Sequence, residues 1–309
     1  MRFGIAGLGR MGANIARHAT ETGHQVVGFD PSERTRTELS GEGVEPAASL
    51  EELVARLQRP RVILLYVPHG EITDRVTTEL LGLLAEDDIL VDGGNSHWMD
   101  SRRRYATFAE KGIRFVDMGT SGGIEGARTG ACFMVGGPRS AYELIEPLLV
   151  DLAVSPQAVV HAGEDGGSGH FVKLIHNAIE FGMIESIAEG VEMLRRSDYE
   201  LDLPALFVNW NHGSVIRSWL IELMGNALAQ NDEAAWERLS TYVEDTDEVK
   251  WVLNWALDAD IPSPVIAHAQ QQLMQYRDLE WPAAKAVALL RNQFGGHPVH
   301  RVGDTEPRA

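Results

Sequence analysis

The chain has 309 residues, which is enough for two domains with a large apolar core. Its 27 Lys and Arg face 45 Asp and Glu, and this acidic surface disfavours non-specific binding to nucleic acids or anionic membranes. The only cysteine is Cys132, which excludes an internal disulfide, and no apolar run approaches the length of a membrane span. We therefore expect a cytoplasmic protein in which any anionic ligand meets a local basic cluster.

A glycine pattern near the N-terminus indicates dinucleotide binding. Residues 2–6 predict a strand, an amphipathic helix runs to about Thr22, and between them lie Gly7, Leu8, Gly9, Arg10, Met11 and Gly12. In this context Gly7 permits a tight turn, Gly9 lets a pyrophosphate approach the backbone, and Gly12 lets the helix pack on the strand. The helix N-terminus offers its N–H groups to the phosphates. We expect all six residues to bind the cofactor.

The residue that ends the second strand bears on which dinucleotide is bound. This strand spans 25–29 and is followed by Asp30, 18 residues after Gly12. An acidic residue here accepts hydrogen bonds from the adenosine ribose and repels a 2′-phosphate, which favours NAD over NADP. Arg34 and Arg36 follow closely and could still hold a 2′-phosphate, so NADP stays open as the less favoured cofactor.

Strands and helices alternate up to about residue 163. Further apolar strands are expected at 62–67, 89–92, 115–118 and 133–135. Helices are expected near 32–39, 74–84, 98–111 and 141–149, with another beginning at the capping pattern Ser49/Glu52. Such alternation predicts a Rossmann-type, doubly wound and mostly parallel sheet. Cys132 lies in the apolar run 131–135, where we expect a buried structural thiol.

The second part of the chain is helical in pattern. A long helix is predicted over 169–196, followed by helices at 203–225, 233–243, 248–259, 264–276 and 283–294. We therefore expect a dinucleotide-binding domain over 1–163 and an all-α domain over 164–309, for which the family resemblance described below implies substrate binding and dimerisation. The polar tail 303–309 is expected to fray.

Three loops that follow strands contain small and polar residues. They are Val67-Pro68-His69-Gly70, Asp92-Gly93-Gly94-Asn95-Ser96 and Gly119-Thr120-Ser121-Gly122-Gly123. Ligands bind at the carboxyl edge of an open parallel sheet, so we expect Val67, Pro68 and Asn95 beside the cofactor. Asn95 and Ser121 can also bond an amide or a hydroxyl. Any one loop can be an ordinary turn, but three at one edge favour a site.

The long helix carries one polar stripe on a largely apolar surface. His170, Lys173, His176, Asn177 and Glu180 recur at helical spacing and therefore share one face. A lysine that is partly removed from water has a lowered pKa and can act as a general base near neutral pH. The alternative is a Lys–Glu pair with two hydrogen-bonded core histidines, and the stripe alone does not decide between them.

Taken together, these motifs resemble the β-hydroxyacid dehydrogenase superfamily, and within it the 6-phosphogluconate dehydrogenase family. The resemblance rests on GLGRMG, on DGGNS at 92–96, on DMGTSGGIEGARTGACFMVGG at 117–137 and on HFVKLIHNAIEFG at 170–182. It implies oxidative decarboxylation of 6-phosphogluconate to ribulose 5-phosphate with reduction of NAD. It further implies a cytoplasmic homo-oligomer, dimer or tetramer, whose C-terminal segment completes the neighbouring site.

The resemblance also assigns roles to residues. Lys173 is similar to the family's catalytic base, Glu180 to its acid, and Asn177 to a further catalytic residue. The sugar-binding residues would be Asn95, Ser121, Gly122, Gly123, His176 and Asn177. The phosphate and carboxylate ligands would be Lys250, Arg277, Arg291 and His297. No metal is expected, because the protonated lysine stabilises the carbonyl oxygen on which charge develops when carbon dioxide leaves.

Three departures from the family pattern are visible. The chain has the length of a short form, which often prefers NAD. Phe181 replaces a tyrosine whose hydroxyl contacts the substrate phosphate, and His97 stands where an acidic residue is common. Two alternatives therefore stay open: a β-hydroxyacid dehydrogenase for a small unphosphorylated 3-hydroxy acid, and a non-catalytic or imine reductase-like dinucleotide-binding relative.

Overall fold

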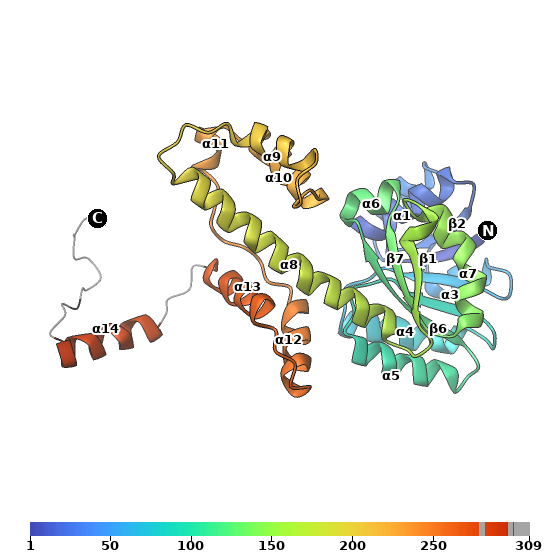
Figure 1. Cartoon of the computed structure of the whole chain (residues 1–309). Helices are drawn as coiled ribbons and strands as arrows, with labels where there is room; N and C mark the ends of the chain where they lie inside the picture. Colours follow the sequence, from blue (N-terminus) through green and yellow to red (C-terminus); the bar gives the residue numbers. More distant parts are fainter. Residues whose placement is uncertain (278–281, 296–298, 300–309) are drawn as a thin grey trace. The chain divides into compact units, whose positions relative to one another are not determined.

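The computed structural model describes residues 1–277, 282–295 and 299 (Figure 1). The chain divides into two compact units, of which the first comprises Met1–Phe181 and Asp247–Pro262. The second comprises Gly182–Thr246 and Ser263–Ala309. The division falls inside a single long helix, whereas the predicted boundary at 163/164 follows the change in sequence pattern and stays a prediction.

An eight-stranded sheet forms the centre of the first unit, in the order β3-β2-β1-β4-β5-β6-β7-β8. The strands are β1 Arg2–Ala6, β2 Gln25–Phe29, β3 Glu45–Ala47, β4 Val62–Leu65, β5 Ile89–Asp92, β6 Arg114–Ser121, β7 Cys132–Gly136 and β8 Val159–Gly163. All neighbours pair in parallel except β6 and β7, which are antiparallel. The mostly parallel, doubly wound sheet predicted from the sequence is confirmed.

Helices cover both faces of this sheet. They are α1 Arg10–Glu21, α2 Glu33–Ser40, α3 Leu50–Ala55, α4 Glu71–Leu83, α5 Trp98–Ala109, α6 Gly123–Thr129, α7 Arg139–Leu152 and the 3₁₀ turn Pro156–Ala158. Helix α12 Glu248–Asp258 belongs to the same unit. Side chains of α1 and α7 share one buried apolar cluster with the sheet, and side chains of α3, α4 and α5 share the other. Buried on two faces, the strands are continuously apolar, as in Val62–Leu65.

Three short elements of the first unit were not predicted. Strand β3 has only three residues, and β8 is a partly exposed strand at the edge of the sheet. Helix α6 follows Gly122, whose φ is +108°, within a glycine-rich segment that suggested a loop. Capping at Ser49 also differs in detail: its hydroxyl accepts from the Glu52 N–H at 3.1 Å, but the Glu52 carboxylate accepts from the N–H of Ala48.

The described part of the second unit is helical. Helix α8 Ser168–Arg195 begins in the first unit and ends in the second, and the others are α9 Leu203–Asn211, α10 Trp219–Gln230, α11 Glu233–Trp236, α13 Pro264–Gln275 and α14 Pro282–Gly295. Helices α8, α9 and α10 share a core that contains Val191, Leu203, Phe207, Ile221 and Leu228. Among the described helices, none combines the length and the apolar character needed to cross a bilayer.

Two predicted helices of this unit were wrong in extent. The helix over 203–225 is interrupted between α9 and α10, where Gly213 has a φ of +134° and Ser218 caps α10 by accepting from the Ile221 N–H at 3.3 Å. The helix over 233–243 ends at Trp236, and the N–H of Val243 instead donates to the carbonyl of Tyr276 at 2.9 Å. The tail 303–309 lies outside the described residues.

Asp117, in the middle of β6, holds the start of helix α8. Its carboxylate is fully buried and accepts from the N–H groups of Gly167 and His170, each at 2.7 Å. A Cβ on Gly169 would lie 2.4 Å from the Asp117 carbonyl oxygen, and one on Gly136 would lie 2.4 Å from the Gly169 nitrogen. Two glycines therefore let the helix lie directly on the strands, and the carboxylate fixes it there.

Replacing this carboxylate should destabilise the protein strongly. We expect Asp117→Ala to lower the free energy of unfolding by roughly 3 kcal/mol, because two buried N–H groups lose their acceptor. The matched control is Asp202→Ala, which removes an exposed cap that accepts from the Ala205 N–H at 3.1 Å and should cost about 1 kcal/mol. Urea unfolding measures both, and equal losses would contradict the special position of Asp117.

Candidate functional site

The glycine loop between β1 and α1 leaves open space at one position. Gly7 has a φ of +94°, and its Cβ would lie 2.3 Å from the carbonyl oxygen of Tyr66. A Cβ on Gly12 would lie 1.9 Å from the Gly7 carbonyl oxygen, so the fold itself requires both glycines. A Cβ on Gly9 would meet no atom within 4 Å. This space beside the N-terminus of α1 fits the close approach of a dinucleotide pyrophosphate.

Asp30 lies beside this loop at the end of β2. Its Oδ2 accepts from the N–H of Leu8 at 2.9 Å, and its Oδ1 accepts from the N–H of Ser32 at 2.9 Å. Arg36 donates to the backbone carbonyl of Asp30 at 2.6 Å, and the exposed Arg34 pairs with Glu38 at 3.4 Å. Asp30 therefore stands where a ribose-binding carboxylate is expected, while both arginines already have acceptors.

The loops that follow β4 and β5 touch each other. A Cβ on Gly94 would lie 3.1 Å from the carbonyl oxygen of Val67, and one on Gly93 would meet the ring of Tyr66 at 2.8 Å. The hydroxyl of Thr73 donates to the carbonyl of Pro68 at 2.8 Å and so ties this loop to α4. Val67 and Pro68 thus share the sheet edge with the loop that carries Asn95, as predicted.

A buried ion pair anchors the loop after β5. Asp92 is 1% exposed and accepts from Ser96 Oγ at 2.9 Å, from the N–H of Gly94 at 3.1 Å and from Arg104 at 3.3 Å. Arg104, itself buried, also donates to Asp74 at 2.9 Å. The sequence did not predict this network, because the charged partners of Asp92 come from two separate helices and no local pattern links them.

The polar stripe of α8 contains a connected set of groups around Lys173. Its side chain is 9% exposed, and a Cβ on Gly119 would lie 2.3 Å from the Lys173 Cβ, so the lysine stem packs on β6. Lys173 Nζ lies 3.4 Å from Nδ1 of His176, and the Nε2 of that ring lies 3.2 Å from Ser121 Oγ. His176 Nδ1 also lies 3.3 Å from Asn177 Oδ1 and 3.7 Å from Glu180 Oε2. The structure therefore brings together the three predicted catalytic residues, Lys173, Asn177 and Glu180, with His176 and Ser121.

Burial lowers the pKa values of Lys173 and His176. It lowers the pKa of Lys173 below its ordinary value, while the charges of Glu180, Cys132 and Glu248 act in the opposite direction. The pKa of His176 is also lowered, first by burial and then by the neighbouring lysine. A lysine with a lowered pKa can be neutral near physiological pH and can therefore accept a proton.

Burial distinguishes one residue of the stripe, His170, and one residue beside it, Cys132. His170 is 1% exposed, with its Nδ1 2.7 Å from Ser101 Oγ, so for this member of the stripe the core-histidine interpretation is correct. Cys132 was expected to be a buried structural thiol, but it is only half-buried and is paired with Ser121 across β6 and β7. Burial raises the pKa of its thiol, which the Lys173 charge opposes. The apolar run 131–135 gave no sign of this neighbour.

Helix α12 packs against the loop that carries Asn95. The Asn95 amide nitrogen donates to the Glu248 carboxylate. The Trp251 ring lies 5.2 Å from that of His69 and 5.0 Å from that of His97. His97, to which the sequence gave no role, caps α5 by accepting from the Met99 N–H at 3.1 Å. The predicted anion ligand Lys250 lies in the same turn of α12 and pairs with Asp247 at 2.7 Å.

The remaining predicted substrate ligands lie at the start of α6, in the second unit or outside the described residues. Gly122 and Gly123 begin α6 with positive φ, and a Cβ on Gly123 would meet nothing within 4 Å. Arg277 lies in the second unit, 3.8 Å from Asp245. Arg291 is exposed on α14 of that unit, and His297 lies outside the described residues. Their roles stay predictions. In residues 1–277, 282–295 and 299, no cluster of three or more His, Cys, Asp or Glu could hold a metal ion.

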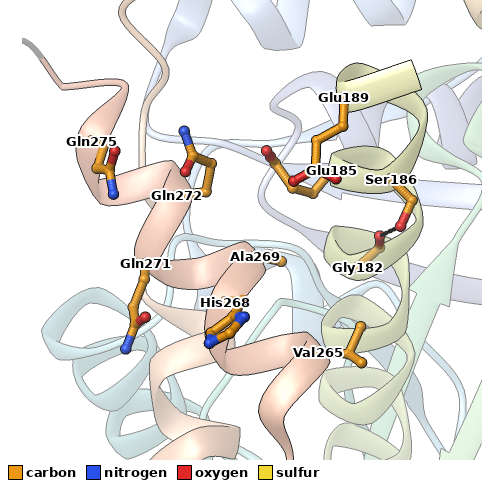
Figure 2. Close-up of a pocket in the computed structure, with 10 residues that line it drawn as sticks. All are labelled: Gly182, Glu185, Ser186, Glu189, Val265, His268, Ala269, Gln271, Gln272 and Gln275. Atoms are coloured by element: carbon orange, nitrogen blue, oxygen red, sulfur yellow. Dashed lines mark hydrogen bonds between the residues drawn. The ribbon is translucent and has the colours of Figure 1, made fainter. Parts of the chain in front are cut away.

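A separate cavity of about 360 Å³ lies in the second unit, between the second half of α8 and α13 (Figure 2). Its lining is mostly polar, with Glu185 and Glu189 on α8 facing His268 and several glutamines of α13. Glu185 also accepts from the hydroxyl of Tyr276 at 2.8 Å. None of the residues predicted to form the site lines this cavity.

Comparison with known proteins agrees with both halves of the chain. Residues 2–163 match the NAD binding domain of 6-phosphogluconate dehydrogenase, and residues 169–288 match the C-terminal domain of that enzyme. YqeC of Bacillus subtilis, which carries a provisional name as a 6-phosphogluconate dehydrogenase, is 44% identical over 97% of this chain and all of the relative. The NAD(+)-dependent, decarboxylating 6-phosphogluconate dehydrogenase of Haloferax volcanii is 36% identical over 98% of this chain and all of its own length.

A solved structure agrees as well. The 6-phosphogluconate dehydrogenase of Plasmodium falciparum superposes with a TM-score of 0.83 at 26% identity, covering 99% of this chain and 67% of that one. The curated relatives include NADP(+)-dependent as well as NAD(+)-dependent forms. The two family models together span nearly the whole chain, and they coincide with the open glycine loop and with the Lys173 stripe. The chain therefore belongs to the 6-phosphogluconate dehydrogenase family.

Proposed function

We propose that this protein oxidises and decarboxylates 6-phosphogluconate to ribulose 5-phosphate and carbon dioxide, with NAD as the preferred electron acceptor. The observation that carries the proposal is the buried Lys173, which has a lowered pKa and lies 3.4 Å from His176 on the stripe that includes Glu180. This is the arrangement that proton abstraction from a secondary alcohol needs. A family member with this arrangement intact is expected to be catalytic.

The dinucleotide, held by residues 7–12 and Asp30, would supply the hydride acceptor. Neutral Lys173 accepts the proton of the C3 hydroxyl as that carbon is oxidised to a ketone. The resulting ammonium stays beside the carbonyl oxygen and stabilises the negative charge that develops there when carbon dioxide leaves. The lysine thus acts first as a base and then as an electrostatic stabiliser.

Glu180 is the proposed acid that protonates C1 of the enediol left after decarboxylation. Its carboxylate lies 3.7 Å from His176 Nδ1, at the end of the stripe away from Asp117. Ser121, His176 and Asn177 would bond the sugar hydroxyls, together with Asn95 and the backbone at Gly122 and Gly123. Lys250, Arg277, Arg291 and His297 are the proposed ligands of the phosphate and carboxylate groups.

The preference for NAD is supported by the surroundings of Asp30. Its carboxylate would repel a 2′-phosphate, and Arg36, which could have attracted one, donates instead to backbone carbonyls of Asp30 and Pro31. We propose NAD as the favoured cofactor on this ground.

A homo-oligomer, in which the C-terminal segment completes the neighbouring site, is part of the same proposal. Helix α8 exposes apolar side chains along much of its length, including Ile179 at 54% and Met193 at 69%. Trp219 on α10 and Leu290 on α14 are also exposed, at 47% and 63%. Exposed apolar surface of this extent supports association with another copy.

The primary test is reduction of NAD and NADP in parallel with 6-phosphogluconate, with carbon dioxide release followed in the same sample. We expect reduction coupled to carbon dioxide release, faster with NAD. Reduction without carbon dioxide, or activity only with a small unphosphorylated 3-hydroxy acid, would favour the second candidate. Phe181 is the observation behind that candidate, because phenylalanine offers no hydroxyl to a phosphate.

Removal of the base should abolish most turnover while leaving cofactor binding intact. We expect Lys173→Met to lower kcat by at least about 10²-fold, the usual size of a general-base contribution. The matched control is Lys111→Met, which makes the same change at an exposed lysine of the first unit. Steady-state kinetics and NAD titration measure the effects, and near-normal turnover would remove Lys173 from its role.

The pH dependence should follow the titration of Lys173. A lysine must be neutral to accept a proton, so kcat/KM should rise with pH through its pKa. Because burial lowers that pKa, the midpoint of this rise in kcat/KM should lie below pH 10.5. Glu180→Gln removes a charge that opposes this lowering, and the rise in its residual activity should move to still lower pH. If kcat/KM of Glu180→Gln rises at the same pH as that of the wild type, Lys173 is not the titrating group.

The cofactor preference should depend on Asp30. We expect Asp30→Ala to reduce the ratio of kcat/KM for NAD over NADP by about tenfold, through loss of ribose hydrogen bonds and of repulsion toward a 2′-phosphate. Glu33→Ala, a change of an exposed carboxylate at the start of α2, should leave the ratio unchanged. The ratio is the decisive quantity, because Asp30 also accepts from Leu8 and its loss can weaken both cofactors alike.

A further inference from the structure

Glu248 stands in the candidate site without a role in the proposed mechanism. It begins helix α12, and its carboxylate accepts a hydrogen bond from the side-chain nitrogen of Asn95. The two residues are 153 positions apart in the sequence but belong to the same compact unit. A carboxylate is an unexpected neighbour for a residue that helps to bind an acidic substrate, and this calls for a physical reason.

The chemistry of the two groups supplies that reason. The two ends of an asparagine amide are nearly identical in shape, but one only donates hydrogen bonds and the other only accepts them. An ionised carboxylate only accepts. Glu248 therefore determines which way the Asn95 amide is turned: the nitrogen faces Glu248, and the oxygen is left for another partner.

The position of Glu248 is well determined by its helix. Trp251, one turn further on, contacts the rings of both His69 and His97, and Trp255 packs edge-on against Phe171 at 4.8 Å. A carboxylate in the first turn is also favoured in its ionised form by the positive end of the helix dipole. Asp247, immediately before it, has a φ of +70°, a strained conformation for a residue other than glycine and one that tends to occur at functional sites.

The charge of Glu248 also reaches the proposed base. Three charges act on the pKa of Lys173 against burial: Glu180 on α8, Cys132 on β7 and Glu248 on α12. His176, the nearest titratable neighbour on α8, has its own pKa lowered by Lys173. Glu248 thus touches one predicted ligand-binding residue and acts electrostatically on the base.

We propose that Glu248 is a positioning residue that fixes the Asn95 amide, so that the amide oxygen accepts a hydrogen bond from a neutral O–H or N–H donor of the bound ligand. The proposal rests on the proposed function. An amide oxygen repels phosphate and carboxylate, so Asn95 would recognise either a hydroxyl of the sugar acid or the carboxamide N–H of the nicotinamide. The anionic groups of the substrate would then be left to the cations.

The kinetic test uses Glu248→Gln, which keeps the shape but can donate as well as accept. Asn95 is then no longer held in one orientation, and we expect kcat/KM to fall about tenfold, equivalent to about 1.4 kcal/mol. A rise in KM for 6-phosphogluconate would identify a sugar hydroxyl as the donor, and a rise in KM for NAD would identify the carboxamide. The matched control is Asp258→Asn, the same change of charge at the exposed end of α12, which should behave like the wild type.

Two further readouts separate positioning from a general structural effect. The rise of kcat/KM with pH should move to lower pH in Glu248→Gln, because a charge that raises the pKa of Lys173 is lost. In an Asn95→Ala background, Glu248→Gln should lower the pH-independent maximum of kcat/KM no further, because the amide it holds is already gone. Unchanged kinetics in Glu248→Gln, or fully additive losses in the double variant, would overturn the proposal.

The contact itself can be tested without any activity. Thermal unfolding of Asn95→Ala, Glu248→Ala and the double variant should give a loss of Tm in the double variant that is smaller than the sum of the two single losses. Additive losses would overturn the proposal on their own. A wild type that is silent with 6-phosphogluconate would instead reject the proposed function, while this cycle would still decide whether Glu248 holds Asn95.

Discussion

The candidate site depends on how the start of α8 is attached to the sheet. Two N–H groups at the start of this helix donate to the buried carboxylate of Asp117, and glycines at 136 and 169 remove the side chains that would separate helix from strands. A helix turns by about 100° per residue, so a slip of one position would rotate the whole polar stripe away from its neighbours. The same attachment presses the Lys173 stem onto Gly119 and so buries its ammonium. One interaction therefore sets both the position and the pKa of the proposed base.

Asp117 has a counterpart in the next strand. Asp92 on β5 is its direct partner in the sheet register, and both carboxylates are buried. The two negative charges repel each other, and this repulsion adds to the effect of burial in raising the pKa of Asp117. Asp92 is compensated by Arg104 and the N–H of Gly94, whereas Asp117 is compensated by the helix start and by His170. Two carboxylates that are partners on neighbouring strands thus fix the two parts of the candidate site: Asp92 holds the loop of Asn95, and Asp117 holds the helix of Lys173.

The features that could be predicted from the sequence are those that depend on a short, continuous stretch of residues. The glycine loop, the apolar strands and the polar stripe each lie within a short window, and each was found. The short elements β3 and α6 were missed because three to seven residues carry too little periodicity, and the interruption between α9 and α10 was missed because apolar residues continue through it. The contact of Glu248 with Asn95 could not be inferred, because its partners are far apart in the chain and only the folded structure places them together.

On the proposed function this acidic chain must recognise an anion, and the partners of its cations limit how much ion pairing can contribute. Lys250 pairs with Asp247, and Arg277 lies near Asp245, so two of the proposed anion ligands already have carboxylate partners. On the proposed function, a phosphate or carboxylate of the substrate would exchange one ion pair for another, which limits the net gain in affinity. Discrimination between the substrate and other anions must then also come from neutral groups of the site. An amide whose orientation is fixed by a carboxylate offers this, because it accepts from hydroxyl or carboxamide groups and repels anions. The acidic residues would in this way direct the neutral groups of the ligand to Asn95 and leave its anionic groups to the lysine and the arginines.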